Sequence, residues 1–410
     1  MPTHTSAPSC SVSLFDERVL ADPYPTYTAL RSTGPAVHLE QHGVWAVPGY
    51  AEVHAVLKDP VTFSSDGGVA LTEQANSGIL ADSMMARDGE EHARLRQVLA
   101  RRLSPRAVSK RREELSSRAH RLVADHTRTG FFESVALARQ MVCETSGSLV
   151  GLTEPENSVL LAGTFDVFGP DNDRFRQALP EAAAMRAALE RALSRETVAP
   201  DSLAAAAYTA VDRDKLTEPE AVALTCDYAT ASVDTTVLGL VETIARLAQD
   251  PVQWTRLRKD PDRAEAAFHE ALRLDAPIQG RGRIVTRTTA LGGVRIEAGE
   301  QLWLLYGSTG RDERKWGARA DTYDLVRPFA DRHLALGEGS HQCPGVSLAL
   351  MQARCLLRAL AHRCAHLAPA GDLVRALHNT VRGYTSVPVA VELSPHAGNA
   401  TSPSAARRPR

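Results

Sequence analysis

The sequence predicts a mainly α-helical fold that carries a few small β-sheets. Apolar residues recur with helical period over many long segments, whereas strand patterns are confined to short pieces of the chain. The chain has 410 residues, of which 43% are hydrophobic, so it can bury a large core. We expect a single domain over residues 14–394, because the candidate functional residues are spread over most of the chain and must converge.

The predicted helices share apolar positions three and four residues apart: 23–31, 50–58, 90–102, 107–127, 134–150, 176–196, 218–249, 262–274 and 346–362. The predicted strands are residues 36–47, 284–305 and 385–393. Gly292 and Gly293 suit a hairpin turn inside the second of these strand segments. Residues 64–85 and 166–175 are rich in turn formers and should form loops.

The two ends of the chain, residues 1–13 and 395–410, are rich in Ser, Pro, Ala and Arg, so we expect both to be disordered. The amino terminus lacks the pattern of a signal peptide, and no run of about 18 apolar residues could span a bilayer. A net charge of −2 gives no general attraction to nucleic acid or membrane. We therefore expect a soluble, cytoplasmic protein that binds neither.

The predicted helix 90–102 carries His92 and Arg96, which are four residues apart and therefore share one face. Both side chains could approach the same carboxylate, although an ordinary charged face turned to solvent has the same pattern. A basic cluster follows in a chain that is slightly acidic overall. It consists of Arg101, Arg102, Arg106, Lys110, Arg111 and Arg112.

The longest predicted helix, from about Pro219 to Asp250, would span about 48 Å, enough to cross the whole molecule. Its apolar middle is interrupted by Asp234, Thr235 and Thr236. Such residues compete with the backbone hydrogen bonds of a helix, so their presence in the middle of this one is locally unfavourable. The alternative to a functional role is a threonine that only bonds back to its own helix.

Glu270 and Arg273 are three residues apart and share a face of the predicted helix 262–274. A Glu and an Arg at this spacing usually form a solvated surface pair that contributes little.

Cys343 lies in LGEGSHQCPG, residues 336–345, just before the apolar helix at 346–360. A lone thiolate held on a tight glycine-rich loop can be the single axial ligand of a haem iron, a site that favours oxygen activation. A buried structural cysteine is the alternative. The remaining cysteines show no C-x-x-C pairing, which argues against a zinc site, an iron–sulfur cluster or a disulfide framework. There is also no Walker loop and no Rossmann glycine motif.

Taken in order along the chain, these motifs resemble the cytochrome P-450 family of haem-thiolate monooxygenases. The resemblance implies the cytochrome P-450 fold, with haem b between the long central helix and the cysteine-ligand loop. It also implies roles for individual residues. Cys343 would be the iron ligand, and Glu270 and Arg273 would form a buried core network with Arg327. The haem propionates would be bound by His92, Arg96, Arg283 and His341.

By the same resemblance, Asp234 and Thr235 would relay protons beside bound dioxygen. The sequence departs from the family at Leu336, where the loop usually begins with Phe, and at Ser232, where the long helix usually has Gly. The implied activity is a monooxygenase that takes electrons from a ferredoxin and its reductase. It would hydroxylate, O-demethylate or epoxidise a small to medium organic substrate. A peroxide-driven peroxygenase and a haem-thiolate binding or sensor protein without turnover are the alternatives.

Three segments, SSDGGVALT, PIQGRGRIVTR and HNTVRGYTSVPV, resemble bacterial para-methoxybenzoate-type O-demethylases. Cys226 and Asp227 on the long helix depart from that group, as do residues 280–282 before Arg283. These departures favour a larger substrate, such as a natural-product intermediate, over a simple benzoate. If Asp227 and Asp234 face one cavity, the substrate should be cationic or a hydrogen-bond donor. The alternative pairs Asp227 with an Arg of a neighbouring helix.

Pro344, directly after the cysteine, has no backbone N–H to donate to the sulfur. This predicts an electron-rich thiolate and a low iron potential. Alternatively, Gly345 and Val346 supply the bonds to the sulfur.

Overall fold

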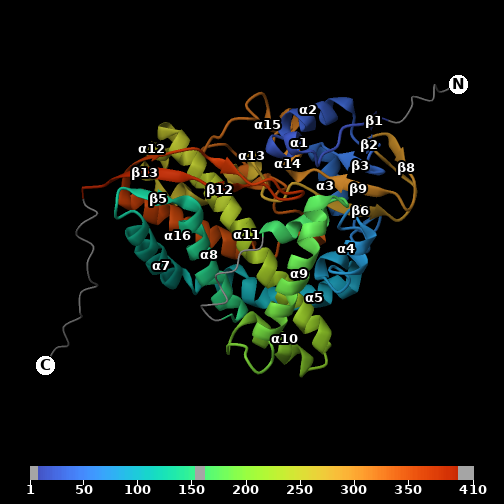
Figure 1. Ribbon diagram of the computed structural model, residues 1–410, viewed down its shortest axis with the longest axis horizontal. Coiled ribbons are helices and arrows are strands. Elements are labelled where there is room, and N and C mark those ends of the chain that lie inside the picture. The colour runs from blue at the N-terminus through green and yellow to red at the C-terminus, as the bar shows by residue number, and fades with distance from the viewer. Residues whose placement is uncertain (1–7, 153–161, 396–410) are drawn as a thin grey trace.

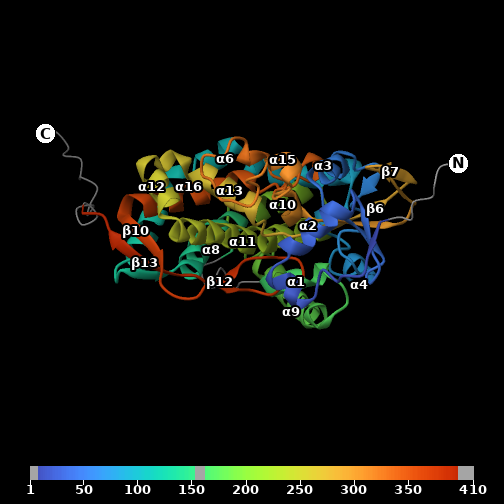
Figure 2. The same ribbon diagram turned by 90° about the horizontal axis from the view of Figure 1, so that it is seen from above.

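The computed structural model describes residues 8–152 and 162–395, and these form a mainly helical molecule with small sheets, as predicted. One long helix, α11, runs through its middle (Figure 1). Seen from above, α13 and α16 lie on one side of α11, and α9 and β12 lie on the other (Figure 2).

The α-helices of five or more residues are α1 (Glu17–Ala21), α2 (Tyr24–Thr33), α3 (Tyr50–Lys58), α4 (Glu73–Ser77), α5 (Gly89–Leu103), α6 (Pro105–Ser109), α7 (Arg112–His126), α8 (Ser134–Val150), α9 (Asp173–Ala192), α10 (Leu203–Val211), α11 (Glu218–Gln249), α12 (Pro251–Lys259), α13 (Ala264–Leu274) and α16 (Val346–Arg363). The strands are β1 (Ser9–Cys10), β2 (Val37–Leu39), β3 (Val44–Val47), β4 (Phe63–Ser64), β5 (Phe131–Glu133), β6 (Arg281–Val285), β7 (Thr289–Leu291), β8 (Val294–Ile296), β9 (Gln301–Leu304), β10 (Cys364–Pro369), β11 (Val374–Arg375), β12 (Tyr384–Ser386) and β13 (Pro388–Leu393).

Helix α11 begins at a capping box, in which the Thr217 side chain accepts from the Glu220 N–H and the Glu220 carboxylate accepts from the Thr217 N–H. This arrangement satisfies two backbone donors that a helix start leaves without partners. The second half of α11 is buried almost all round, and it packs against α8 and α13. The helix is therefore fixed at the centre of the molecule by its packing, and the side chains along it are held at defined positions.

The largest sheet has the strand order β1-β2-β3-β9-β6-β4. Strand β6 is antiparallel to β9, and this pairing places Arg281 opposite Leu304 and Arg283 opposite Leu302. Gly292 and Gly293 adopt φ values of +57° and +88° between β7 and β8, so the predicted hairpin turn is confirmed. Because Arg281 and Arg283 are two residues apart on one strand, they share a face of the sheet.

Several sequence predictions need correction. The segment 64–85, predicted as a loop, contains α4, and helices α1, α10 and α12 were not predicted. The segment predicted as one helix at 107–127 is two, because Ser104 caps the short α6 and the chain turns at Arg111 before α7 runs along α16. Strands β4, β5, β10 and β11 were not predicted; β5 directly precedes α8, and β10 directly follows α16. Residues 1–13 were expected to be disordered, but Ser9–Cys10 pair with β2. Residues 1–7 and 396–410 lie outside the described part of the chain.

Two residues of α13, Glu270 and Arg273, form a buried ion network with Arg327. Arg273 donates to Glu270 at 2.7 and 2.8 Å, and Arg327 donates to the same carboxylate at 2.8 Å. Glu270 and Arg273 have no exposed surface. The family resemblance therefore predicted this trio correctly, and the pair is not a solvated surface contact.

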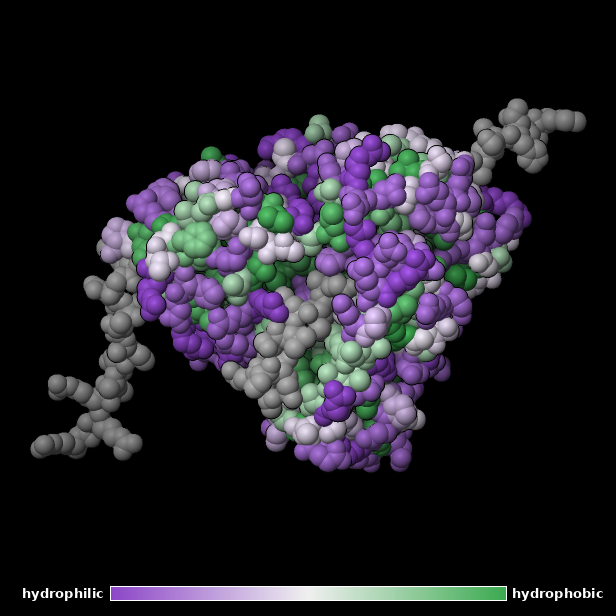
Figure 3. All heavy atoms as spheres, in the orientation of Figure 1, coloured by the Kyte–Doolittle hydropathy of each residue, from purple (hydrophilic) through white to green (hydrophobic). Residues whose placement is uncertain are grey.

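Hydrophilic side chains dominate the face of the molecule seen in Figure 1, with hydrophobic ones in small separate patches (Figure 3). Over residues 8–152 and 162–395, no helix is both long enough and apolar enough to cross a membrane. None of the six cysteines forms a disulfide in the described ranges.

Candidate functional site

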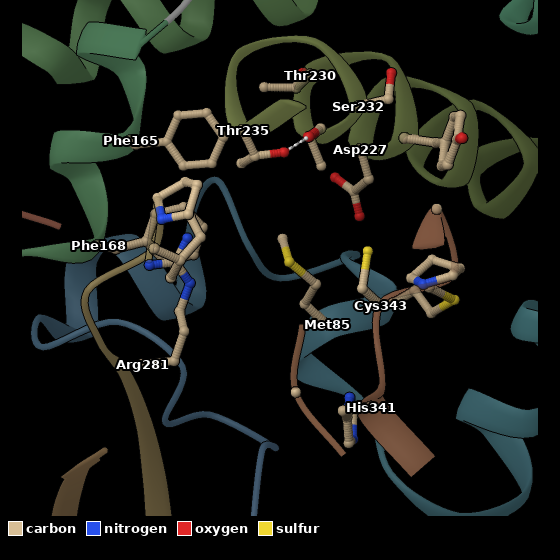
Figure 4. A pocket seen from close by; sticks show the side chains of 18 of the residues that line it. Met85, Phe165, Phe168, Asp227, Thr230, Ser232, Thr235, Arg281, His341 and Cys343 are labelled. Carbon is tan, nitrogen blue, oxygen red and sulfur yellow. Dashed lines mark hydrogen bonds between the residues drawn. The ribbon is translucent and has the colours of Figure 1, made fainter. Parts of the chain in front are cut away.

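A cavity lies between α11, the loop that carries Cys343, strand β6 and the segments 69–85 and 164–168. Every sequence-predicted site residue except Asp234 lines it: His92, Arg96, Thr235, Arg283, His341 and Cys343. Figure 4 shows Thr235 on α11 at one wall and Cys343 on the loop below it. Residues more than 100 positions apart in the chain thus meet at one site.

The loop before Cys343 is shaped by glycines. Gly337 and Gly339 have φ values of +67° and +70°, in the left-handed region that favours glycine. A Cβ on Gly339 would also come 2.4 Å from the carbonyl oxygen of Leu57. The Cys343 N–H donates to the Leu336 carbonyl at 2.8 Å, so the tight glycine-rich loop predicted from the sequence is confirmed.

The Cys343 sulfur faces two backbone donors at the start of α16. Burial raises the pKa of the Cys343 thiol, while the N–H groups of Gly345 and Val346 and the nearby Arg96 guanidinium oppose that rise. The sulfur is therefore supplied with hydrogen bonds even though Pro344 has no N–H. This geometry favours the alternative in which Gly345 and Val346 serve the sulfur, over an electron-rich thiolate caused by Pro344.

His92 and Arg96 lie on one face of α5, as their spacing predicted. His92 is 3% exposed, and burial, with His341 and Arg96 nearby, lowers its pKa to about 4. His92 is thus neutral at pH 7 and can act as a hydrogen-bond donor rather than a cation. Arg96 donates to the Gln342 carbonyl in the cysteine loop, so it holds α5 against that loop.

His341 has a partner that the sequence did not reveal. Its Nε2 lies 2.7 Å from Oδ1 of Asp88, the residue before α5, and its ring centre lies 4.2 Å from that of His92, with the two rings tilted by 36°. Burial opposes the shift, but hydrogen bonds from His341, Ser64 and Ser65 hold the pKa of Asp88 well below its usual range. One ring nitrogen of His341 is therefore engaged within the protein. An Asp directly before a helix start was the only signal for this role.

Strand β6 brings two arginines to the cavity, of which the sequence predicted Arg283. Arg283 and Arg281 are 6% and 9% exposed, and each donates to the carbonyl of the residue before it. Burial lowers the pKa of Arg281 to about 10, and its guanidinium lies 3.9 Å from the ring centre of Phe168. Neither arginine forms an ion pair with an acid in the described ranges. Two buried cations without acidic partners are costly, which makes this wall a site for an anionic group.

Thr235 and Asp234 face different sides of α11. The Thr235 hydroxyl lines the cavity and donates to the Ala231 carbonyl at 2.8 Å (Figure 4). Asp234 is 2% exposed. Burial raises the pKa of Cys143 on α8, and the nearby charge of Asp234 adds to that rise. Asp227, two turns earlier, does line the cavity. The hypothesis that Asp227 and Asp234 face one cavity is therefore wrong.

These residues fit haem b. A cysteine sulfur on a glycine-rich loop can serve as the axial ligand, and His92, Arg96 and the unpaired Arg283 can hold the two propionates. The rest of the cavity wall is largely apolar, as the face of a porphyrin requires. Its lining includes Val69, Leu80, Met84, Phe165, Phe168 and Leu348.

Comparison with known proteins agrees with this geometry. Residues 172–389 match the family model for cytochrome P450. The chain is 34% identical to cytochrome p450 CYP199A2 of Rhodopseudomonas palustris, over 93% of this chain and 94% of that protein. It is 30% identical to the cytochrome P450 monooxygenase PikC of Streptomyces venezuelae, over 97% and 98% of the two chains.

The structure of CYP164A2 from Mycobacterium smegmatis superposes with a TM-score of 0.83 at 26% identity, covering 92% of this chain and 98% of that one. Fold, cavity and relatives agree, and the chain belongs to the cytochrome P450 family of haem b-dependent monooxygenases.

Proposed function

We propose that this P450 receives electrons from a ferredoxin and its reductase and oxidises a small to medium organic substrate held between α11 and the Cys343 loop. The observation that carries the proposal is that Thr235 and Cys343 line one cavity from opposite elements. When bound, haem b supplies the redox chemistry that activates dioxygen. The protein supplies the thiolate, the groups that hold the propionates, and protons.

The proposed cofactor-binding residues are Cys343 as axial ligand and His92, Arg96, Arg283 and His341 around the propionates. Arg96 and Arg283 would bring the positive charge, while neutral His92 would donate a hydrogen bond.

Thr235 and Asp234 are proposed to move protons. The Thr235 hydroxyl donates a hydrogen bond to the Ala231 carbonyl. A rotation of the side chain would direct this proton into the cavity. Asp234 precedes Thr235 in the chain and lies on the other side of the helix. From there it would return a proton to the Thr235 hydroxyl through water. This division between a cavity-facing alcohol and a buried acid supports turnover rather than a binding or sensor role.

The cavity wall supports an apolar or aromatic organic substrate. Met84, Met85, Phe165 and Phe168 line it, and the Leu71 N–H is bonded to the Phe168 carbonyl at 3.1 Å. Both segments predicted to be loops, 64–85 and 166–175, therefore contribute residues to the wall. Hydroxylation, O-demethylation and epoxidation are all compatible with this lining, and a natural-product intermediate remains our expected substrate.

The basic cluster of α5–α7 is proposed as the ferredoxin-docking surface. Arg101, Arg106, Lys110 and Arg112 are exposed, and α6 packs against α16, the helix that follows Cys343. The cluster is thus on the cysteine side of the molecule, close to where electrons must enter. An acidic ferredoxin would be attracted there in a salt-dependent way.

Oxygen consumption with a surrogate ferredoxin and its reductase tests the proposal. We expect NADPH-dependent oxygen uptake that rises when a substrate is added. Thr235→Ala should divert the reduced oxygen to hydrogen peroxide, whereas Thr243→Ala, a buried threonine that bonds to Gly239 on the same helix, should not. Turnover with hydrogen peroxide alone would instead indicate a peroxygenase, and no uptake with any donor would indicate a binding protein.

A further inference from the structure

Asp227 is a carboxylate in the wall of the cavity that the proposed chemistry does not use. It lies on α11, two turns before Thr235, and both side chains line the same cavity. Figure 4 shows its carboxylate directed away from α11 towards Met85. An acid at this position meets whatever occupies the space beside Thr235.

The carboxylate is held by the protein on one side alone. The Ser83 hydroxyl and the Met84 N–H face it from the loop before α5. Its other oxygen, Oδ2, is buried and has no hydrogen-bond partner among the described residues. A buried carboxylate oxygen without a donor is costly, so this position favours a ligand that brings one.

No basic side chain of the described residues forms an ion pair with Asp227. Arg186 on α9 is near enough to act on it, but its guanidinium donates to Glu190 at 3.0 Å and to the Ile79 carbonyl at 3.4 Å. Asp82 adds further negative charge from the surface. Burial raises the pKa of Asp227, and Ser83, Arg186 and Met84 oppose that rise. The expected alternative, a direct pair with an arginine of a neighbouring helix, is therefore not formed in the part of the chain described.

We propose that Asp227 is a substrate-binding residue that selects substrates carrying a protonated amine, whose N–H would donate to Oδ2. This assignment rests on the proposed function, because it concerns the substrate of the same cavity. Arg281 does not compete for the amine, since its guanidinium is stacked on Phe168 and bonded to the Gly280 carbonyl. An anionic substrate, drawn to Arg281 instead, is the outcome that would contradict the proposal.

Three probes of one shape provide the test on the haem-loaded protein: 4-methoxybenzyl-dimethylammonium, its neutral isostere 4-isobutylanisole, and the anion 4-methoxyphenylacetate. Dissociation constants are measured by calorimetry for the wild type and for Asp227→Asn. We expect the substitution to weaken the ammonium roughly 10-fold or more, as for a hydrogen bond to a charged group, and to leave the isostere within about 3-fold. The wild type should bind the anion more weakly than the isostere.

Asp82→Asn removes the same charge from an exposed position nearby and serves as the matched control. An equal loss of ammonium affinity in both variants would show a general acidic field and overturn the contact. So would an unchanged affinity in Asp227→Asn, or tighter binding of the anion by the wild type.

The absorption of the reduced carbon monoxide complex is recorded for each protein at about 450 nm. A normal band without a charge preference overturns the role of Asp227 alone. Loss of the band in the wild type would overturn the haem-thiolate site on which both proposals rest. If Asp227→Asn does not fold, the wild-type ranking of the three probes still decides.

Discussion

The ion network of α13 and the basic wall of the cavity both hold buried arginines, but they satisfy them differently. Arg273 is bonded to Glu270 and to the carbonyls of Ala320 and Thr322. Arg283, nearly as buried, donates to one carbonyl of its own strand in the described structure. The comparison teaches that the buried charge of Arg273 finds its partners within the described chain, whereas Arg283 is left able to bind a group from outside it, as its proposed role at a propionate requires.

The largest effect is expected for the cysteine in the cavity, Cys343, and the buried Cys355 of α16 serves as its control. Cys343→Ala should abolish the band of the reduced carbon monoxide complex at about 450 nm, because no thiolate remains to bind iron. Cys355→Ala removes a buried thiol of α16 and should keep the band. If the band survives in Cys343→Ala, Cys343 is not the iron ligand.

The ion network is tested next, through stability. Glu270→Gln leaves Arg273 and Arg327 buried without a counter-charge, so it should lower the free energy of unfolding by about 3 to 5 kcal/mol in urea titration. Glu297→Gln breaks an exposed pair with Arg295 and should leave the unfolding curve unchanged. Equal curves for both variants would mean that the network does not stabilise the fold.

Arg283→Gln sharpens the contrast, since it removes a buried charge that no acid of the described chain balances. The apoprotein should be as stable as the wild type or slightly more stable in urea. Haem transfer to apomyoglobin should be roughly 10-fold faster, because a charge-assisted bond to a propionate is lost. Arg287→Gln, on the same segment but bonded to Thr62, should transfer haem at the wild-type rate. Destabilisation of the apoprotein would make Arg283 a structural residue like Arg273.

A smaller effect is expected at the surface. Arg101→Glu combined with Arg102→Glu should slow reduction by an acidic ferredoxin several-fold at low salt, while substrate affinity stays unchanged. The difference should vanish as salt is raised, because exposed charges are then screened. An unchanged rate of reduction at low salt would contradict the docking surface, and stopped-flow absorbance measures it.

The smallest effect should follow Pro344→Leu, which restores a backbone N–H beside the cysteine. Because Gly345 and Val346 already serve the sulfur, the substrate-free iron potential should move by less than about 60 mV, a tenfold change for a one-electron couple. The iron potential is measured by potentiometric titration. A larger rise of this potential would show that the missing N–H of Pro344 makes the thiolate more electron-rich.

The sequence by itself determined the elements whose signals are local. Helices α3, α8 and α11 begin and end where the apolar period predicted. The glycine-rich loop also followed from neighbouring residues, because left-handed backbone at Gly337 and Gly339 needs no distant contact. Spacing placed Glu270 and Arg273 on one helix face, but only the family resemblance predicted that the pair is buried and joined by Arg327, which is 57 residues away from Glu270.

Tertiary structure alone decided which side chains meet. His341 binds Asp88, 253 residues away, and the position of Asp88 directly before a helix does not by itself identify that partner. Thr235 faces the cavity while Asp234 faces α8, because a helix turns each successive residue by about 100° and only packing sets which face meets which neighbour. The unsatisfied oxygen of Asp227 likewise appears once α9 and the loop before α5 are in place, since a partner is a matter of distance in space and not in sequence.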